Sequence, residues 1–115
     1  MAYPPEDHVM LASAARTTSG SSNTIGLGET KSAYVFFDIT AVSGTLPTMT
    51  VVFYDSPDGG TTWYAFEVLD PVIQTTGQFK KRLIGYGEHI KFDYTLAGTN
   101  PSFTFSTRVY AKYEY

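Results

Sequence analysis

The chain has 115 residues, of which 43% are hydrophobic and 16% aromatic, a size that fits one globular domain. Eight Lys and Arg against eleven Asp and Glu give a net charge of −3, so we expect neither nucleic acid nor an anionic membrane as a partner. The absence of cysteine excludes a disulfide framework, a thiolate nucleophile and a cysteine metal site.

The first 23 residues differ in composition from the rest of the chain. Residues 1–7 are proline-rich and polar, and residues 16–23 form a Ser/Thr/Gly run. Between them, Val9, Met10 and Leu11 are apolar enough to dock either on the domain's own sheet or on a neighbouring subunit. We therefore expect an extended N-terminal arm over residues 1–23 and a single β-sandwich domain over residues 24–115. The first thirty residues show no secretory signal pattern and no apolar run is long enough to span a membrane, so we expect synthesis in the cytoplasm.

Short alternating runs of Thr, Val, Tyr and Phe, separated by Gly, Pro and Asn, predict strands throughout the chain. The clearest lie at residues 34–42, 48–55, 61–69, 88–96 and 103–113, and weaker ones lie at 9–15, 24–27 and 78–84. The segments 48–55 and 61–69 should pair as a hairpin across the turn between them. About eight strands in one all-β domain predict an antiparallel β-sandwich or jelly roll.

An internal repeat lies within these strands. Phe-Asp-Ile-Thr at 37–40 and Gly-Thr-Leu-Pro-Thr at 44–48 are echoed by Phe-Asp-Tyr-Thr at 92–95 and Gly-Thr-Asn-Pro-Ser at 98–102. Each copy predicts a strand, a Gly-Thr-x-Pro turn and a second strand. Because Gly and Pro positions report backbone geometry first, the repeat favours a shared hairpin over a shared ligand site.

Residues 56–63, Ser-Pro-Asp-Gly-Gly-Thr-Thr-Trp, fit the spacing Ser-x-Asp-x-Gly-x-x-Trp, which resembles the Asp-box hairpin of sialidase-type propellers. Asp58 can accept hydrogen bonds from turn amides, Gly60 can supply a positive φ, and Trp63 can fold back over the turn. We therefore expect Ser56, Asp58, Gly60 and Trp63 to form a structural turn. A propeller repeats this element through several blades, so a single copy in a chain of this length argues against a glycosidase.

Nothing in the sequence points to catalytic or metal-binding chemistry. His8 and His89 are the only histidines, and a triad or a two-histidine metal site would need them to converge from distant segments. Asp55 and Asp58 lack the density of oxygen ligands that a calcium loop provides. We therefore expect no catalytic residue, no metal ligand and no cofactor.

Two further surface features have ordinary explanations. The basic run at residues 80–82 alternates across the two faces of a strand, which favours a solvated edge strand over a phosphate-binding track. Tyr54, Trp63, Tyr64 and Tyr86 lie near predicted loops and leave a carbohydrate-binding face as an alternative. Most of the aromatic residues are expected in the core or in a subunit interface.

Four segments, in this order, resemble small virion proteins of tailed bacteriophages. They are Leu-Ala-Ser-Ala-Ala-Arg-Thr at 11–17, Ser-Gly-Thr-Leu-Pro-Thr at 43–48, the turn at 56–63 and Gly-Thr-Asn-Pro-Ser-Phe-Thr-Phe-Ser at 98–106. The resemblance covers nearly the whole chain, although residues 3–7 and the tyrosine-rich end match no motif of the family. It implies a structural protein of a phage particle, with a small β-sandwich or jelly-roll fold and no enzymatic role.

On this resemblance we expect a head decoration, or cement, protein on the outer capsid surface of the virion. Its partners would be the major capsid protein and itself, with a homotrimer implied by analogy with other decoration proteins, and it would stabilise the shell by bridging capsomers. A tail or head-to-tail connector subunit and a carbohydrate-binding module are the alternatives. The expected contact residues are Tyr3, Pro4, Pro5, Val9, Met10, Leu11, Tyr113 and Tyr115.

Overall fold

The computed structural model of the chain describes residues 6–28, 30–70 and 72–112, and within these ranges strands joined by turns and loops are the only regular elements. No helix in the described part is long and apolar enough to cross a membrane. The strands are β1 (Glu6–Arg16), β2 (Gly20–Ser21), β3 (Ile25–Gly26), β4 (Ser32–Ser56), β5 (Tyr64–Val68), β6 (Gly77–Ile84) and β7 (His89–Lys112).

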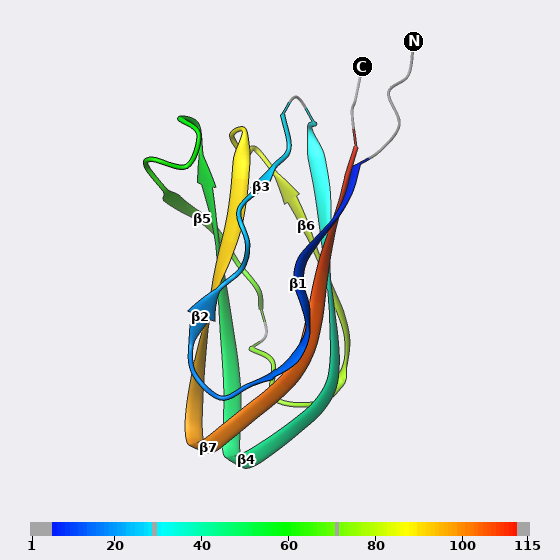
Figure 1. Ribbon diagram of the computed structural model, residues 1–115, viewed down its shortest axis with the longest axis vertical. Coiled ribbons are helices and arrows are strands. Elements are labelled where there is room, and N and C mark those ends of the chain that lie inside the picture. The colour runs from blue at the N-terminus through cyan, green and yellow to red at the C-terminus, as the bar shows by residue number, and fades with distance from the viewer. Residues whose placement is uncertain (1–5, 29, 71, 113–115) are drawn as a thin grey trace.

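Two long strands, β4 and β7, organise the molecule. They pair antiparallel from Ser32↔Lys112 to Ser56↔His89 and bend together near their middle (Figure 1). Because of this bend, each long strand contributes to two halves of the sheet. In the first half, β1 pairs with the end of β7 and β6 pairs with the start of β4. In the second half, β2 and β3 pair with the start of β7, and β5 pairs with the end of β4.

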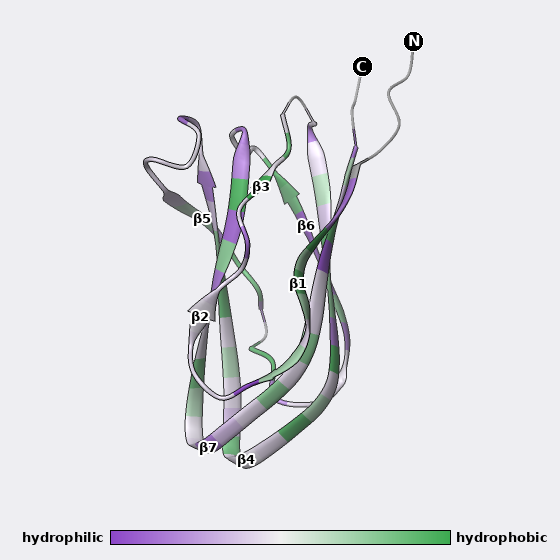
Figure 2. Ribbon diagram, in the orientation of Figure 1, coloured by the Kyte–Doolittle hydropathy of each residue, from purple (hydrophilic) through white to green (hydrophobic). Residues whose placement is uncertain are grey.

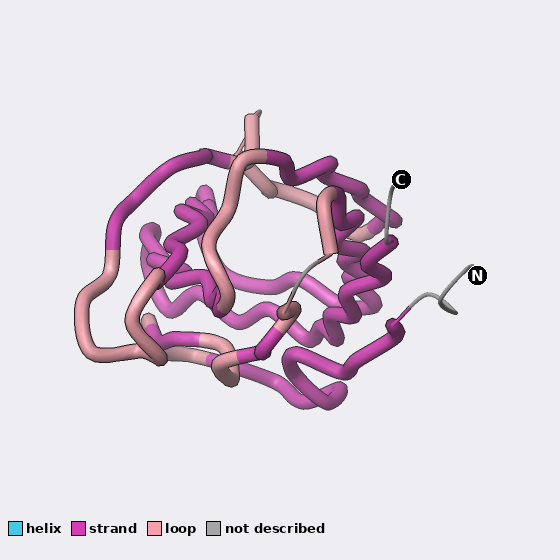
Figure 3. The backbone as a smooth tube through the Cα atoms, turned by 90° about the horizontal axis from the view of Figure 1, so that it is seen from above, coloured by secondary structure: helices cyan, strands magenta, loops and turns pink. Residues whose placement is uncertain are grey.

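The hydrophobic core lies between the two halves of this folded sheet. Hydrophobic and hydrophilic residues alternate along both long strands, and the view from above shows the strands surrounding a common interior (Figures 2 and 3). Phe37, from the first half, has its ring centroid 6.3 Å from that of Phe53 and 5.2 Å from that of Phe92, both from the second half. Each of these fully buried aromatic side chains contributes about 2–3 kcal/mol through burial alone.

The predicted fold class is confirmed in its all-β, antiparallel character, but the arrangement of strands differs from the prediction. All seven strands belong to one open sheet, and hydrogen bonding does not divide them into the separate sheets of a sandwich or jelly roll. The predicted strands 34–42 and 48–55 are one continuous strand, β4, and 88–96 joins 103–112 in β7. These two fusions lower the strand count, and the short strand β2, which is absent from the predicted strands, brings it to seven among the described residues.

The internal repeat explains the fusions, and its predicted hairpins are wrong. The two Gly-Thr-x-Pro segments lie side by side, with Thr45 opposite Thr99, and at each of them the chain bends without reversing. Gly44 and Gly98 have φ of 113° and 111°, and register shifts on both sides of Thr45 mark the bulges that turn the ribbon. The two copies of the repeat therefore pair with each other, and together they form the bend that folds the sheet into two halves.

Residues of the expected N-terminal arm belong to the sheet. Residues 6–16 form β1 along the edge of β7, and Gly20–Ser21 forms β2 on the same strand. The apolar segment at residues 9–11 therefore docks on the domain's own sheet, the first of the two alternatives. The side chain of Met10 is fully buried in the core, Leu11 packs against the core, and Val9 is 53% exposed on the opposite face of the strand. The expected contact residues Tyr3, Pro4, Pro5, Tyr113 and Tyr115 lie outside the described residues.

Candidate functional site

The turn at residues 56–63 is held by its own side chains. Ser56 Oγ donates a hydrogen bond of 2.7 Å to Asp58 Oδ1 and accepts one of 2.9 Å from the Gly60 amide. Asp58 Oδ1 also accepts from the Thr62 amide at 2.9 Å, and Gly60 has a φ of 94°. The bond from the Thr62 amide, with the Ser56 hydroxyl second, lowers the pKa of Asp58 to about 2. Asp58 therefore serves to stabilise the turn, through bonds to Ser56 and Thr62.

Two of the aromatic residues beside this turn, Trp63 and Tyr54, contact Lys91, whereas Tyr64 is 57% exposed. Lys91 Nζ lies 5.1 Å from the ring centroid of Trp63 and 5.4 Å from that of Tyr54, which stands directly opposite Lys91 in the sheet. Trp63 also packs beside Gly60, where a Cβ would be 3.5 Å from Trp63 Cζ2. A sugar ring stacking on Trp63 or Tyr54 would compete with the Lys91 contact, which weakens the carbohydrate alternative.

The two histidines lie in opposite halves of the folded sheet. His8 stands opposite Val109 in the first half, and His89 stands opposite Ser56 in the second. Asp55 Oδ2 accepts a hydrogen bond of 2.7 Å from the Gly87 amide, a loop contact like those of Asp58. In the described part of the chain, no three His, Asp or Glu side chains are grouped as a metal site would require.

The basic run at residues 80–82 divides between the two faces of β6, as the alternation predicts. Lys81 forms an ion pair of 3.5 Å with Glu67 of β5. This pair links β6 and β5, which pair with opposite ends of β4. Lys80 and Arg82 stand on the other face, opposite Phe36 and Tyr34 of β4. The run therefore places two of its three cations on the outer surface of the first half-sheet.

That outer surface, which we call the aromatic–basic face, collects side chains from four strands. Register fixes its rows: Arg108, Phe36 and Lys80 form one, and Tyr110, Tyr34 and Arg82 form the next. The face consists of Asp7 and Val9 from β1, Tyr34, Phe36 and Asp38 from β4, Gln78, Lys80, Arg82 and Ile84 from β6, and Ser106, Arg108, Tyr110 and Lys112 from β7.

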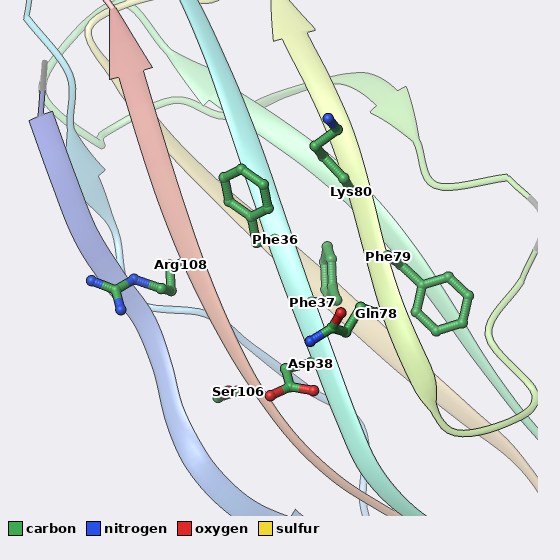
Figure 4. A pocket seen from close by; sticks show the side chains of 8 residues that line it. All are labelled: Phe36, Phe37, Asp38, Gln78, Phe79, Lys80, Ser106 and Arg108. Atoms are coloured by element: carbon green, nitrogen blue, oxygen red, sulfur yellow. The ribbon is translucent and has the colours of Figure 1, made fainter.

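Three large apolar side chains of this face are strongly exposed. Val9, Phe36 and Ile84 are 53%, 40% and 58% exposed, although each lies in a regular strand of the sheet. Beside Phe36 the surface is hollowed by about 480 Å³, and Figure 4 shows Asp38, Gln78 and Ser106 below the ring, with Lys80 and Arg108 on the flanking strands. Val9 and Phe36 lie on either side of Arg108 in one row and Ile84 lies beyond Arg82 on β6, so the face offers separate apolar contacts within a charged surface.

Three of the four cations of the face, Lys80, Arg108 and Lys112, contact neighbouring side chains. Lys80 Nζ and Lys112 Nζ lie 5.3 Å and 5.9 Å from the ring centroid of Tyr34. Arg108 donates to both carboxylate oxygens of Asp7, with Nη2 to Oδ2 at 2.8 Å and Nε to Oδ1 at 3.2 Å. This surface is therefore organised before any partner binds, which lowers the entropy cost of binding.

Of the expected contact residues that the structure describes, only Val9 lies on this face. Met10 points into the core, and Leu11 is partly buried against it. Sequence reasoning missed Phe36, Lys80 and Arg108, which come from three strands distant in sequence. Alternation assigns each to a face of its own strand, but only the pairing of β4 with β6 and β7 brings them together.

The fold and this surface define an all-β protein built on one folded antiparallel sheet. No family model matches the chain, and no curated protein matches its sequence. Solved structures share the fold. A protein of Bacillus endospore appendages, described as a novel family of disulfide-linked pili, has a TM-score of 0.57 at 17% identity over 96% of this chain and 88% of its own.

Two further solved structures match over nearly their whole length. The SPBc2 prophage-derived protein YomS has a TM-score of 0.51 at 14% identity, covering 96% of this chain and 97% of its own. FLHE has a TM-score of 0.50 at 11% identity, covering 98% and 100%. At sequence identities of 11–17%, the similarity to these three structures shows a shared fold and nothing further.

Proposed function

We propose that the chain is a non-enzymatic structural subunit of a phage particle, and that it decorates the head by binding the major capsid protein on the outer surface. The observation that carries this proposal is the exposure of Val9, Phe36 and Ile84 on one face of the sheet, among the cations of that face. Two further points support it: the sequence resembles small virion proteins, and the prophage-derived YomS has a similar fold.

The mechanism is non-covalent bridging. A preorganised face formed by paired strands can cover the junction between neighbouring shell subunits without ordering a loop, so little of the contact energy is lost on binding. Each copy needs to contribute only a few kcal/mol, because a shell binds many copies. Self-association as a homotrimer would add contacts between copies and belongs to the same proposal.

A tail or connector subunit is the second candidate. It is favoured by the likeness in fold to the protein of endospore appendages, which are pili and therefore filamentous assemblies. This chain contains no cysteine, so disulfide links such as those named for those pili cannot join its copies.

The test is co-sedimentation of the purified protein with phage heads that lack it and, in parallel, with isolated tails. Saturable binding to heads at many copies per particle supports decoration, and binding to tails alone supports the second candidate. Deleting the first 23 residues is unsuitable as a probe, because it removes β1 and the fully buried Met10. Point substitutions on the exposed face leave the core intact and serve instead.

A further inference from the structure

We infer that the aromatic–basic face recognises a carboxylate-rich polypeptide surface. This inference rests on the proposed function, because the shell or tail would supply that surface. The first support is charge: Lys80, Arg82, Arg108 and Lys112 with Asp7 and Asp38 give the face a net charge of +2, whereas the other four cations and nine carboxylates of the chain give −5. The face is therefore a positive surface on an acidic protein.

Three cations of the face are available to a partner. In the part of the chain that the structure describes, the ion pairs link Lys81 to Glu67, Lys91 to Asp93 and Arg108 to Asp7. Lys80, Arg82 and Lys112 therefore lack a carboxylate partner there, and all three are exposed. Their charge can pair with carboxylates of another molecule, which gives the contact both attraction and orientation.

The mixed chemistry of the face favours a polypeptide over a nucleic acid. Asp38 stands exposed in the hollow, where its carboxylate can accept hydrogen bonds from peptide N–H groups, donors that a phosphate backbone does not carry. The ring of Tyr34, the natural stacking platform, is approached by the ammonium groups of Lys80 and Lys112. Gln78 and Ser106, which line the same hollow, can exchange hydrogen bonds with peptide groups, while Phe36 offers apolar contact.

The test is an NMR titration of the ¹⁵N-labelled protein with poly-L-glutamate and, separately, with an oligothymidylate. We expect poly-L-glutamate to shift the amides of β6, the start of β4 and the end of β7, and to bind roughly tenfold more weakly to the double variant Lys80→Gln/Arg82→Gln. Lys81→Gln is the matched control, because it removes a cation from the same strand but from the other face. We expect that variant to keep most of the affinity.

Three results would overturn the inference: tighter binding of the oligothymidylate, shifts located away from this face, or equal losses in the double variant and in Lys81→Gln. The head-binding assay keeps the two proposals distinct. If the wild-type protein binds heads and the double variant binds them equally well, the face assignment fails and decoration survives. If the wild type binds no heads but shows the expected poly-L-glutamate shifts, decoration fails and the chemistry of the face stands.

Discussion

Gly44 of β4 and Gly98 of β7 make equivalent close contacts, each with the backbone of the other's strand. A Cβ on Gly44 would be 2.7 Å from the carbonyl oxygen of Asn100, and a Cβ on Gly98 would be 2.7 Å from that of Leu46. Leu46 and Asn100 in turn share positive φ values of 51° and 50°. These four residues occupy equivalent places in the internal repeat, so the bend that folds the sheet has a local two-fold symmetry.

The bend should therefore tolerate no side chain at either glycine. Gly98→Ala places a methyl group against two backbone carbonyls, at 2.7 and 2.8 Å, in a backbone conformation with φ of 111°. We expect it to lower the free energy of unfolding by about 3 kcal/mol or more in urea denaturation.

Gly59→Ala is the matched control for this prediction. Gly59 also has a positive φ, of 76°, but nothing lies within 4 Å of the position that the added methyl group would take. It should lose only about 1 kcal/mol, the cost of the backbone conformation itself. Equal losses at both positions would show that close packing of the two strands does not shape the bend.

The turn at 56–63 should give the protein a pH-dependent stability in the acid range. The pKa of Asp58 is about 2 in the folded chain against an ordinary 3.8, so the unfolded chain binds more protons between these values. The contribution of Asp58 is complete above pH 3.8 and is lost as the pH falls toward 2.

Asp58→Asn isolates this contribution. We expect thermal melts to show the wild type more stable than the variant at pH 5 and the difference to shrink steadily below pH 4. A difference between wild type and variant that stays constant from pH 5 to pH 2 would mean that ionisation of Asp58 does not support the turn.

Arg16 should stabilise the end of β1 far more than its surface position indicates. Its guanidinium donates to the carbonyl oxygens of Phe105 and Ala12 at 2.8 Å and of Ala14 at 3.0 Å, and lies 4.6 Å from the ring centroid of Phe105. Lysine cannot reproduce this fork, so Arg16→Lys should cost about 1–2 kcal/mol in urea denaturation.

Arg108→Lys provides the comparison for Arg16. Arg108 forms an exposed pair with Asp7, and its replacement by lysine should cost about 0.5 kcal/mol or less. If Arg16→Lys is as mild as Arg108→Lys, the three carbonyl contacts do not anchor the strand.

How far the sequence predicts this fold depends on how local each feature is. Alternation identifies strands correctly in 34–42 and in 103–112, the described part of the predicted strand 103–113, because side-chain period follows from the strand itself. The turn residues Ser56, Asp58 and Gly60 also act locally, over a few positions. In contrast, a Gly-Thr-x-Pro segment ordinarily ends a strand. Here each copy continues as a bend within a paired ribbon, because it pairs with the other copy, 54 residues away in the sequence.

The candidate surface could not be predicted from the sequence, because it also depends on the pairing of distant segments. A short apolar run identifies Val9, and its pairing with Arg108 places it on the face. Phe36 lies in no motif, and Lys80 belongs to a basic run that predicts only a solvated edge strand; their proximity follows from the register of β4 and β6. Register between distant strands depends on the whole core, which a pattern along one segment does not contain.

The most direct test of the account compares Val9→Ser with Val68→Ser in binding to heads that lack the protein. Both positions are valines in strands, 53% and 46% exposed, but only Val9 lies on the aromatic–basic face. The account predicts saturable binding of the wild type and of Val68→Ser at the same copy number, with markedly weaker binding of Val9→Ser. Wild-type protein that fails to bind heads, or a loss that follows Val68 and spares Val9, would contradict it.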